Sequence, residues 1–264
     1  MTAGVLGWTL PRHLIHKRDL VRELVVRDMK LRYKRSYLGI AWTLVNPLIQ
    51  LLVYDFVFRV LFRVNTPNYT TYLFIGITCW GWFSGAILES TQAILKNKDL
   101  IRQPRFPSEL LPNVTVGTHL IHYLLTLPVL FGLLYVSNIP VTGALVWLPV
   151  VIVVQYLLTL AFSMLAAVVH VNFRDTQYLL GVFLMLGFFM TPILYDVAIV
   201  PERYRAIYHL NPMTYLVDAY RAVLLRGEAP DWGTLAIITG ASLVLLKLFY
   251  LLFRKVGTNF VEEF

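Results

Sequence analysis

The stretch ALVWLPVVIVVQYLLTLAFSMLAAVVH, residues 144–170, decides the fold class of this chain. It is a run of 27 residues without a single Asp, Glu, Lys or Arg. A helix of roughly 20 apolar residues crosses the hydrocarbon core of a bilayer, which is about 30 Å thick. The stretch is therefore long enough to span a membrane.

Other apolar stretches on both sides of it meet the same criterion. Together they predict six spans, at 38–62, 70–90, 111–136, 144–170, 177–195 and 234–253. The 264 residues are 58% hydrophobic and 14% charged, with a mean hydropathy of +0.65, whereas soluble domains carry about 25% charged residues. We predict an all-α membrane protein with one domain, comprising a cytoplasmic segment (1–37), a six-span bundle (38–253) and a cytoplasmic tail (254–264).

The distribution of Lys and Arg predicts the orientation. With both termini in the cytoplasm, the inner segments hold 16 of these residues and the outer segments five. Positive charge gathers on the cytoplasmic side of membrane proteins. The net charge of +8 is therefore expected to face anionic lipid and cytosolic partners rather than nucleic acid.

The segment before the first span is basic and amphipathic. Residues 17–35, KRDLVRELVVRDMKLRYKR, place Val21, Leu24, Val25 and Met29 on one side of a helix. Such a helix is expected to lie in the headgroup plane. An orientation anchor and a partner-contacting helix are both open interpretations.

Several chemistries lack the residues that they need. The one cysteine, Cys79, allows no internal disulfide, and none of the seven lysines is followed by Ser or Thr as a Walker A loop requires. No apolar core follows the basic N-terminal residues, so we expect no cleavable signal peptide. We predict a chain that is not an enzyme and that holds no cofactor or metal of its own.

Charged and imidazole side chains inside spans are the usual candidates for function. His119 and His122 suit one helix face, but no acid lies nearby in the sequence to complete a metal site, so we interpret them as packing groups. Asp55 and Arg59, four residues apart, are interpreted as a structural pair near the outer interface. Glu89 stands near a predicted interface, and a proton-driven mechanism is disfavoured.

Polar and aromatic residues form a stripe along the first span. It recurs at steps of three and four residues and comprises Thr43, Asn46, Gln50, Tyr54 and Phe58. Polar groups facing lipid are costly, so the stripe should face protein or a wet path. Further aromatic candidates for a path are Trp82 in the second span and Phe188 and Phe189 in the fifth. Helix packing is the alternative interpretation.

The segment 196–233 is too short for a domain and too apolar for a plain loop. Its apolar runs, 207–210 and 215–225, are separated by Asn211-Pro212. We predict two short helices that dip into the outer leaflet, which is tolerated where backbone packs on protein or lines a cavity. This makes the segment a candidate external gate.

Four stretches of the chain resemble one family. They are RDMKLRYKRSYLGIAWTLVNPLIQLLVY (27–54), KNKDLIRQPRFPSELLP (96–112), NFRDTQYLLGVFLMLGFFMTPILY (172–195) and LNPMTYLVDAYRAVLLRG (210–227). In order and spacing they resemble ABC type 2 exporter permeases for lipid-linked O-antigen, capsule and teichoic acid polymers. The resemblance implies a homodimer in the bacterial cytoplasmic (inner) membrane, two separate ATPase subunits that bind ATP and magnesium, and a lipid-linked glycan as cargo.

The resemblance also implies roles for individual residues. The interface helix would bring four side chains to the cytoplasmic entrance, namely Asp28, Arg32, Tyr33 and Arg35. The coupling helix that docks into the ATPase would comprise Lys98, Asp99, Leu100, Ile101 and Arg102. Recurrent positions of the external gate would be Arg203, Asn211, Pro212 and Arg221.

Other functions stay open on the residues alone. A permease of the same family for a small drug or lipid is one, although the polar and aromatic stripe favours a polymer. An integral membrane enzyme acting on polyprenyl-linked sugars is another, and it would need a cluster of acids or histidines at a membrane face. Within the family, the sequence does not separate O-antigen from capsule or teichoic acid.

Overall fold

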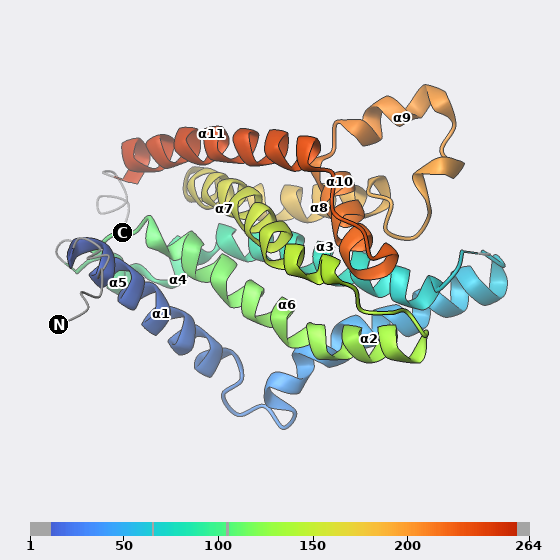
Figure 1. Ribbon diagram of the computed structural model, residues 1–264. Coiled ribbons are helices and arrows are strands. Elements are labelled where there is room, and N and C mark those ends of the chain that lie inside the picture. Colours follow the sequence, from blue (N-terminus) through green and yellow to red (C-terminus); the bar gives the residue numbers. More distant parts are fainter. Residues whose placement is uncertain (1–11, 65, 104–105, 258–264) are drawn as a thin grey trace, which may run out of the picture.

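The computed structural model describes residues 12–64, 66–103 and 106–257, and within them every regular element is a helix (Figure 1). Part of the predicted cytoplasmic segment (1–11) and most of the predicted tail (258–264) lie outside the described residues. The prediction of an all-α fold is confirmed.

Five helical stretches of the described chain are long and apolar enough to cross a membrane. The first is Gly39–Leu61, which comprises a 3-10 turn, α2 (Trp42–Asp55) and a π-helical turn (Phe56–Leu61). The others are α3 (Tyr69–Thr91), α6 (Leu110–Val136), α7 (Leu148–Asn172, preceded by the 3-10 turn Gly143–Trp147) and α11 (Trp232–Gly257). They correspond to five of the six predicted spans.

The fifth predicted span is shorter than expected. The sequence predicts it over 177–195, but α8 runs only over Thr176–Met190, about 22 Å at 1.5 Å per residue. Pro192 explains the early end, because it lacks an N–H group and disfavours helical backbone at the residue before it. Thr191 accordingly has extended backbone, with φ −100° and ψ 136°.

Helix α3 lies at the centre of the bundle. Helices α2, α6, α7 and α8 pack against it, and α11 packs against α7 on the other side. In the most apolar window of α3, 78% of the residues are buried, against 6% for the first span. The first span is therefore a peripheral helix, and most of its side chains are not buried within this chain.

The two ends of the bundle differ (Figure 1). At the α5 end lie α4 (Ala93–Lys96), α5 (Lys98–Ile101), the start of α1 (Arg12–Arg32) and the end of α11. At the α9 end lie α9 (Glu202–His209), α10 (Pro212–Arg221) and the turn between α2 and α3. The segment 196–233 thus contains two short helices, α9 exposed and α10 largely buried, while their position in the outer leaflet stays a prediction.

The apolar side of α1 packs on the protein, whereas the sequence predicts that this helix lies in the headgroup plane. Leu24 and Val25 are buried against Val114 of α6, and Leu20 and Val21 pack around them. This side of the helix therefore rests on the protein's own third span, and the polar side is left for lipid headgroups or partners.

Candidate functional site

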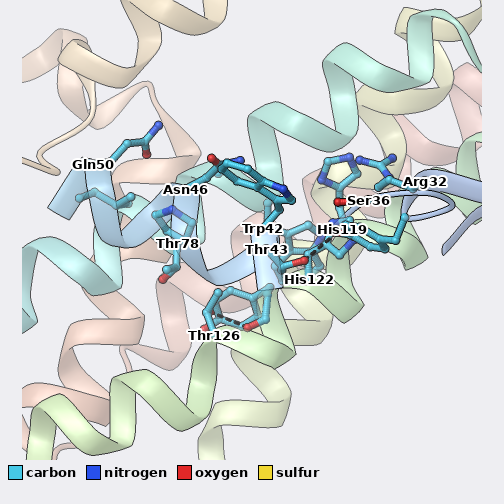
Figure 2. A pocket seen from close by; sticks show the side chains of 16 residues that line it. Arg32, Ser36, Trp42, Thr43, Asn46, Gln50, Thr78, His119, His122 and Thr126 are labelled. Carbon is cyan, nitrogen blue, oxygen red and sulfur yellow. Dashed lines mark hydrogen bonds between the residues drawn. The ribbon is translucent and has the colours of Figure 1, made fainter. Parts of the chain in front are cut away.

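A cavity of about 480 Å³ opens where α1 ends and the first span begins (Figure 2). Its walls come from the segment after α1, from α2, from α3 and from α6, and they bring together the predicted Arg32, Tyr33, Thr43, Asn46, Gln50 and Trp82. We call it the first cavity. Its lining is mainly polar near Arg32, with His119 and His122 facing it from α6.

A second cavity of about 320 Å³ adjoins the first along α2. The two share Gln50, Ile77 and Gly81 as wall residues. Tyr54, Phe188 and Phe189 also line this second cavity, which lies between α2, α3 and α8. The stripe therefore runs along two adjoining cavities, polar in the first and aromatic in the second.

The amides of the stripe are not covered by this chain. Asn46 and Gln50 are exposed although both lie within a helix that is long enough to span a membrane. Unpaired amides in hydrocarbon are costly, so these side chains require water or another protein surface beside them. The geometry thus leaves both interpretations of the stripe open, a wet path along α2 and packing against another protein surface.

Two other predicted path residues lie differently. The Trp82 ring is buried, stacked on Tyr123 with centroids 5.3 Å apart, and forms the back wall of the first cavity. Phe58 is stacked on Phe62 at 5.6 Å, packs partly against the core, and lines neither cavity.

An ionic cluster closes one side of the first cavity, and its centre is Glu89 of α3. One carboxylate oxygen accepts a hydrogen bond from Arg32, and the other lies 2.8 Å from Nε2 of His119. Burial lowers the pKa of the Arg32 guanidinium, but its hydrogen bond and charge interaction with Glu89 outweigh this, so that its pKa is raised. The cluster thus fastens the end of α1 to α3 and α6.

Polar rings extend the cluster toward the stripe. The Tyr33 hydroxyl lies 2.7 Å from Thr43 Oγ1 and 3.1 Å from His122 Nε2. The predicted entrance residue Asp28 lies 3.8 Å from Arg32, one turn away on α1. Arg35, the fourth such residue, is in the turn after α1 with a φ of 66°, and it does not line the first cavity.

Sequence reasoning missed Glu89 as the partner of these groups. It found no acid near His119 because it compared neighbours along the chain, and Glu89 is 30 residues away. The sequence shows only a glycine, Gly85, inside an apolar span, and the structure gives its reason, since a Cβ there would stand 2.7 Å from His119 Cε1. Glycine at this position lets the imidazole lie against α3, one turn before Glu89.

The predicted coupling segment forms α5 and is fastened to α1. Ile101 is buried against the chain's own helices, and Leu100 packs against the Leu24–Val25 cluster. Arg27 of α1 donates a hydrogen bond of 2.6 Å to Asn97, which precedes α5. Among the five residues of the predicted segment, Asp99 and Arg102 are exposed and Lys98 is half-buried.

At the α9 end, Arg221 lies inside the protein. It is 4% exposed, its guanidinium sits 3.3 Å from the centroid of the Tyr72 ring, and it donates to the carbonyl oxygens of Pro192 and Ile193 at 2.6 and 3.0 Å. Its side chain therefore fastens the turn after α8 to α3. Arg221, one of the five basic residues assigned to the outer segments, is thus buried in protein rather than exposed at a membrane surface.

The other predicted gate residues lie around α9 and α10. Asn211 is the N-cap of α10, accepting from Met213 N at 3.0 Å, and it donates to Thr191 at 2.8 Å. Pro212 is the first residue of α10, a position that needs no N–H donor. Arg203 is exposed on α9, with its guanidinium over the Tyr204 ring at 4.6 Å.

The predicted pair in the first span is loose. Asp55 and Arg59 stand 4.0 Å apart, and Arg59 is 62% exposed. A shorter contact is the hydrogen bond that Thr70 donates to Asp55 at 2.7 Å. This bond joins the end of α2 to the start of α3.

Comparison with known protein families agrees with this geometry. The profile of the family described as "ABC-2 type transporter" matches residues 19–225, which include the first cavity, the α5 loop and α10. The chain belongs to the ABC-2 type transporter family. It is 36% identical over 256 residues to the O-antigen export system permease protein RfbA of Myxococcus xanthus, covering 96% of this chain and 98% of that protein.

Two further relatives of this ABC-2 chain bear related names. The O-antigen export system permease protein RfbA of Klebsiella pneumoniae is 30% identical over 92% of this chain and 94% of its own length. The polysialic acid transport protein KpsM of Escherichia coli is 22% identical over 89% and 92%, respectively.

Membership in the ABC-2 family indicates a transporter subunit rather than an enzyme. The structure does bring Glu89, His119 and His122 together, but Glu89 is paired with Arg32 and His119. Within the described residues, no group of three His, Cys, Asp or Glu side chains is placed to hold a metal ion.

Proposed function

We propose that this chain is the membrane permease subunit of an ATP-driven exporter that moves O-antigen-type, polyprenyl-linked polysaccharide across the bacterial cytoplasmic membrane. It would act as a homodimer with two separate ATPase subunits, which bind ATP and magnesium, and with both termini in the cytoplasm. The cargo in this proposal rests on the names of the relatives, which cover nearly the whole chain.

The observation that carries a conduit function is the pair of exposed amides in the first span. Asn46 and Gln50 line cavities that continue into an aromatic stretch at Tyr54, Phe188 and Phe189. Amides suit sugar hydroxyls, and aromatic faces suit the apolar C–H faces of sugar rings. A second copy seated against α2 and α8, whose outer faces are apolar and exposed, would enclose these cavities.

Contacts of this chain provide a route from the ATPase to the cavities. Asp99 and Arg102 are the exposed side chains of the α5 segment, and Asn97 fastens this segment to α1 through Arg27. The end of α1 is in turn fastened to the first cavity through Arg32 and Glu89. Closure of the ATPases would shift α5 and α1 together and so bias the packing around the cavity.

A capsule polymer is the second candidate cargo, and the relationship to the polysialic acid transport protein favours it. That identity of 22% is lower than the 36% and 30% of the O-antigen relatives. A small drug or lipid would not need a path that continues from the first cavity into the second, which makes it the less favoured cargo.

The direct test is deletion of the gene in a strain that keeps its ATPase gene. We expect surface polysaccharide to disappear from gel profiles, lipid-linked polymer to accumulate inside, and the wild-type gene to restore export. Unchanged surface polymer in the deletion strain would contradict the proposal.

The coupling route has its own test. Asp99→Ala with Arg102→Ala should abolish export and weaken co-purification of the ATPase, while the permease keeps its thermal unfolding profile. Glu202→Ala is the control, because Glu202 is also exposed but lies on α9 at the other end of the bundle. Export at the wild-type level in the double variant would show that α5 is not the coupling element.

A further inference from the structure

Helix α11 carries one charged side chain within its apolar length. Between Trp232 and Phe253, Lys247 is the only Asp, Glu, Lys or Arg. A charged residue within a spanning helix is rare and costly, and it usually faces the interior of the bundle or pairs with another charge. The surroundings of Lys247 therefore indicate what it binds.

Lys247 lies on the outward side of α11. The inward side packs against α7, and its buried residues are Leu235, Ile238, Ser242 and Phe253. Lys247 is exposed, and so are the apolar residues around it, namely Leu243, Val244, Leu248 and Leu251. Among the described residues, none forms a hydrogen bond or an ion pair with the Lys247 side chain. Its charge is thus left for a molecule outside this chain.

The outward side of α11 is not the side proposed above for a second copy. That side is formed by α2 and α8, and Figure 1 shows α2 and α11 at opposite edges of the bundle, with α3 and α7 between them. The two cavities along α2 are also separate from α11, since none of their wall residues belongs to this helix. These positions favour a membrane lipid beside Lys247 over the second copy or the cargo.

The depth of Lys247 follows from its distance to the end of the helix. Phe253 shares a buried cluster with Ile101 of α5, so this end of α11 lies beside the proposed coupling segment. Arg254 comes next and is exposed on the same side as Lys247, about 10 Å further along the helix. The four-carbon stem of a lysine is shorter than that, and side chains on a helix lean toward its N-terminus. If Arg254 lies level with the lipid phosphates, the Lys247 ammonium stays within the edge of the hydrocarbon.

The charges of this surface suit a phosphate group. Helix α11 has three basic residues and no acidic residue, the basic ones being Lys247, Arg254 and Lys255. The long side chains of Lys247 and Arg254 can approach each other along the helix, and a phosphate between them accepts from both. Such a phosphate would remove the cost of an unpaired charge in the hydrocarbon. The exposed apolar residues before it offer a surface to the acyl chains.

We propose that the outward side of α11 binds an anionic phospholipid, with its phosphate between Lys247 and Arg254 and its acyl chains along Leu243, Val244 and Leu248. The lipid belongs to the leaflet around the end of α11, which is the cytoplasmic leaflet in the orientation of the proposed function, on which this inference rests. It adds a lipid site away from the path of the cargo. A lipid bound there would hold the end of α11 at a fixed depth beside α5.

Photocrosslinking in nanodiscs tests the proposal on the full chain, co-purified with its ATPase. The probe is phosphatidylglycerol with a diazirine in one acyl chain, and the reference is phosphatidylcholine with the same group. Mass spectrometry of peptides gives the crosslinking yield on residues 243–251 relative to residues 233–242 of the same helix. We expect the yield of phosphatidylglycerol to exceed that of phosphatidylcholine about fivefold, since one basic residue near anionic lipid contributes about 1 kcal/mol.

The deciding variant is Lys247→Gln, which should lower this ratio of yields to about one. It should not lower the midpoint of thermal unfolding, because the side chain is exposed. Lys247→Arg keeps the charge and should keep the ratio. The matched control is Arg59→Gln, which removes the same charge from an exposed residue of the first span and should leave the ratio unchanged.

Four results would overturn the proposal. They are a ratio near one in the wild type, an unchanged ratio in Lys247→Gln, an equal loss in Arg59→Gln, and displacement of the probe by polyprenyl phosphate or inorganic phosphate more effectively than by unlabelled phosphatidylglycerol at equal ionic strength. The last would assign Lys247 to the lipid anchor of the cargo or to a free anion. Each of these leaves the export function standing if the deletion strain loses its surface polymer. Conversely, crosslinking that depends on Lys247, together with unchanged surface polymer in the deletion strain, would contradict the export function alone.

Discussion

Glu89→Gln is expected to release the end of α1 from the bundle. The carboxylate of Glu89 accepts from Arg32 on one oxygen and stands 2.8 Å from His119 on the other, and its side chain is 25% exposed. A hydrogen bond to a charged group contributes about 1.5–3 kcal/mol when buried and less when solvent reaches it. Since glutamine can keep one bond, we expect a loss of about 2 kcal/mol, which corresponds to about 30-fold in an opening equilibrium.

Amide hydrogen exchange in nanodiscs measures this opening. Exchange in the last turn of α1, residues 29–32, should accelerate about 30-fold in Glu89→Gln, whereas the first turns are still held by Leu24 and Val25. The matched control is Glu202→Gln, because Glu202 is 90% exposed and stands 3.9 Å from Arg205. If exchange in this turn stays within twofold of wild type, Glu89 does not fasten α1, and the proposed route through Arg32 loses its last link.

Three further outcomes test other contacts. Gly85→Ala should lower the free energy of unfolding by about 1–3 kcal/mol, because the added Cβ would stand 2.7 Å from His119. The control, Gly132→Ala, adds a Cβ that meets no atom within 4 Å and should not lower it, and thermal unfolding measures both variants. Asn211→Ala should cost about 1 kcal/mol by the same measurement through loss of the α10 cap, and Asn211→Asp, which keeps the cap, should cost less. The Thr234 hydroxyl and backbone N–H groups donate to Asp231 and hold the pKa of its carboxyl below the usual 3.8. Protection of amides in the first turn of α11 should therefore be complete above pH 4 and fall at lower pH, and Asp231→Asn should remove this pH dependence. Amide hydrogen exchange, corrected for intrinsic rates, measures it.

The long apolar runs were predictable because a spanning helix satisfies its own backbone, whatever its neighbours are. The bounds of α3, α6, α7 and α11 accordingly follow the hydropathy of the sequence within a few residues. The end of α8 did not follow hydropathy, since the apolar residues Ile193 and Leu194 lie beyond it. There the backbone chemistry of Pro192 decided the boundary, and a proline rule applied to the sequence would have placed it.

Only one wall of the first cavity could be predicted from the sequence. The stripe on α2 is a property of one helix, so its spacing placed Thr43, Asn46 and Gln50 on one face, and they do line one cavity. The opposite wall comes from α3 and α6, whose contribution depends on how three helices pack. Glu89 and His119 are an example of this, since only packing brings groups 30 residues apart to 2.8 Å.

Arg221 shows why the burial of a charged residue does not follow from its place in the sequence where helices are broken. The last carbonyl groups of α8 have no partner within their own helix, and the turn that follows adds the carbonyl oxygens of Pro192 and Ile193. A guanidinium carries five donors and no acceptor, so one buried arginine can bond several carbonyl oxygens without a carboxylate, and here it also bonds Tyr72 O at 3.4 Å. The N–H donors of Arg221 thus answer the break after α8: the proline that shortens α8 leaves carbonyl oxygens inside the protein, and the arginine 29 residues later satisfies them.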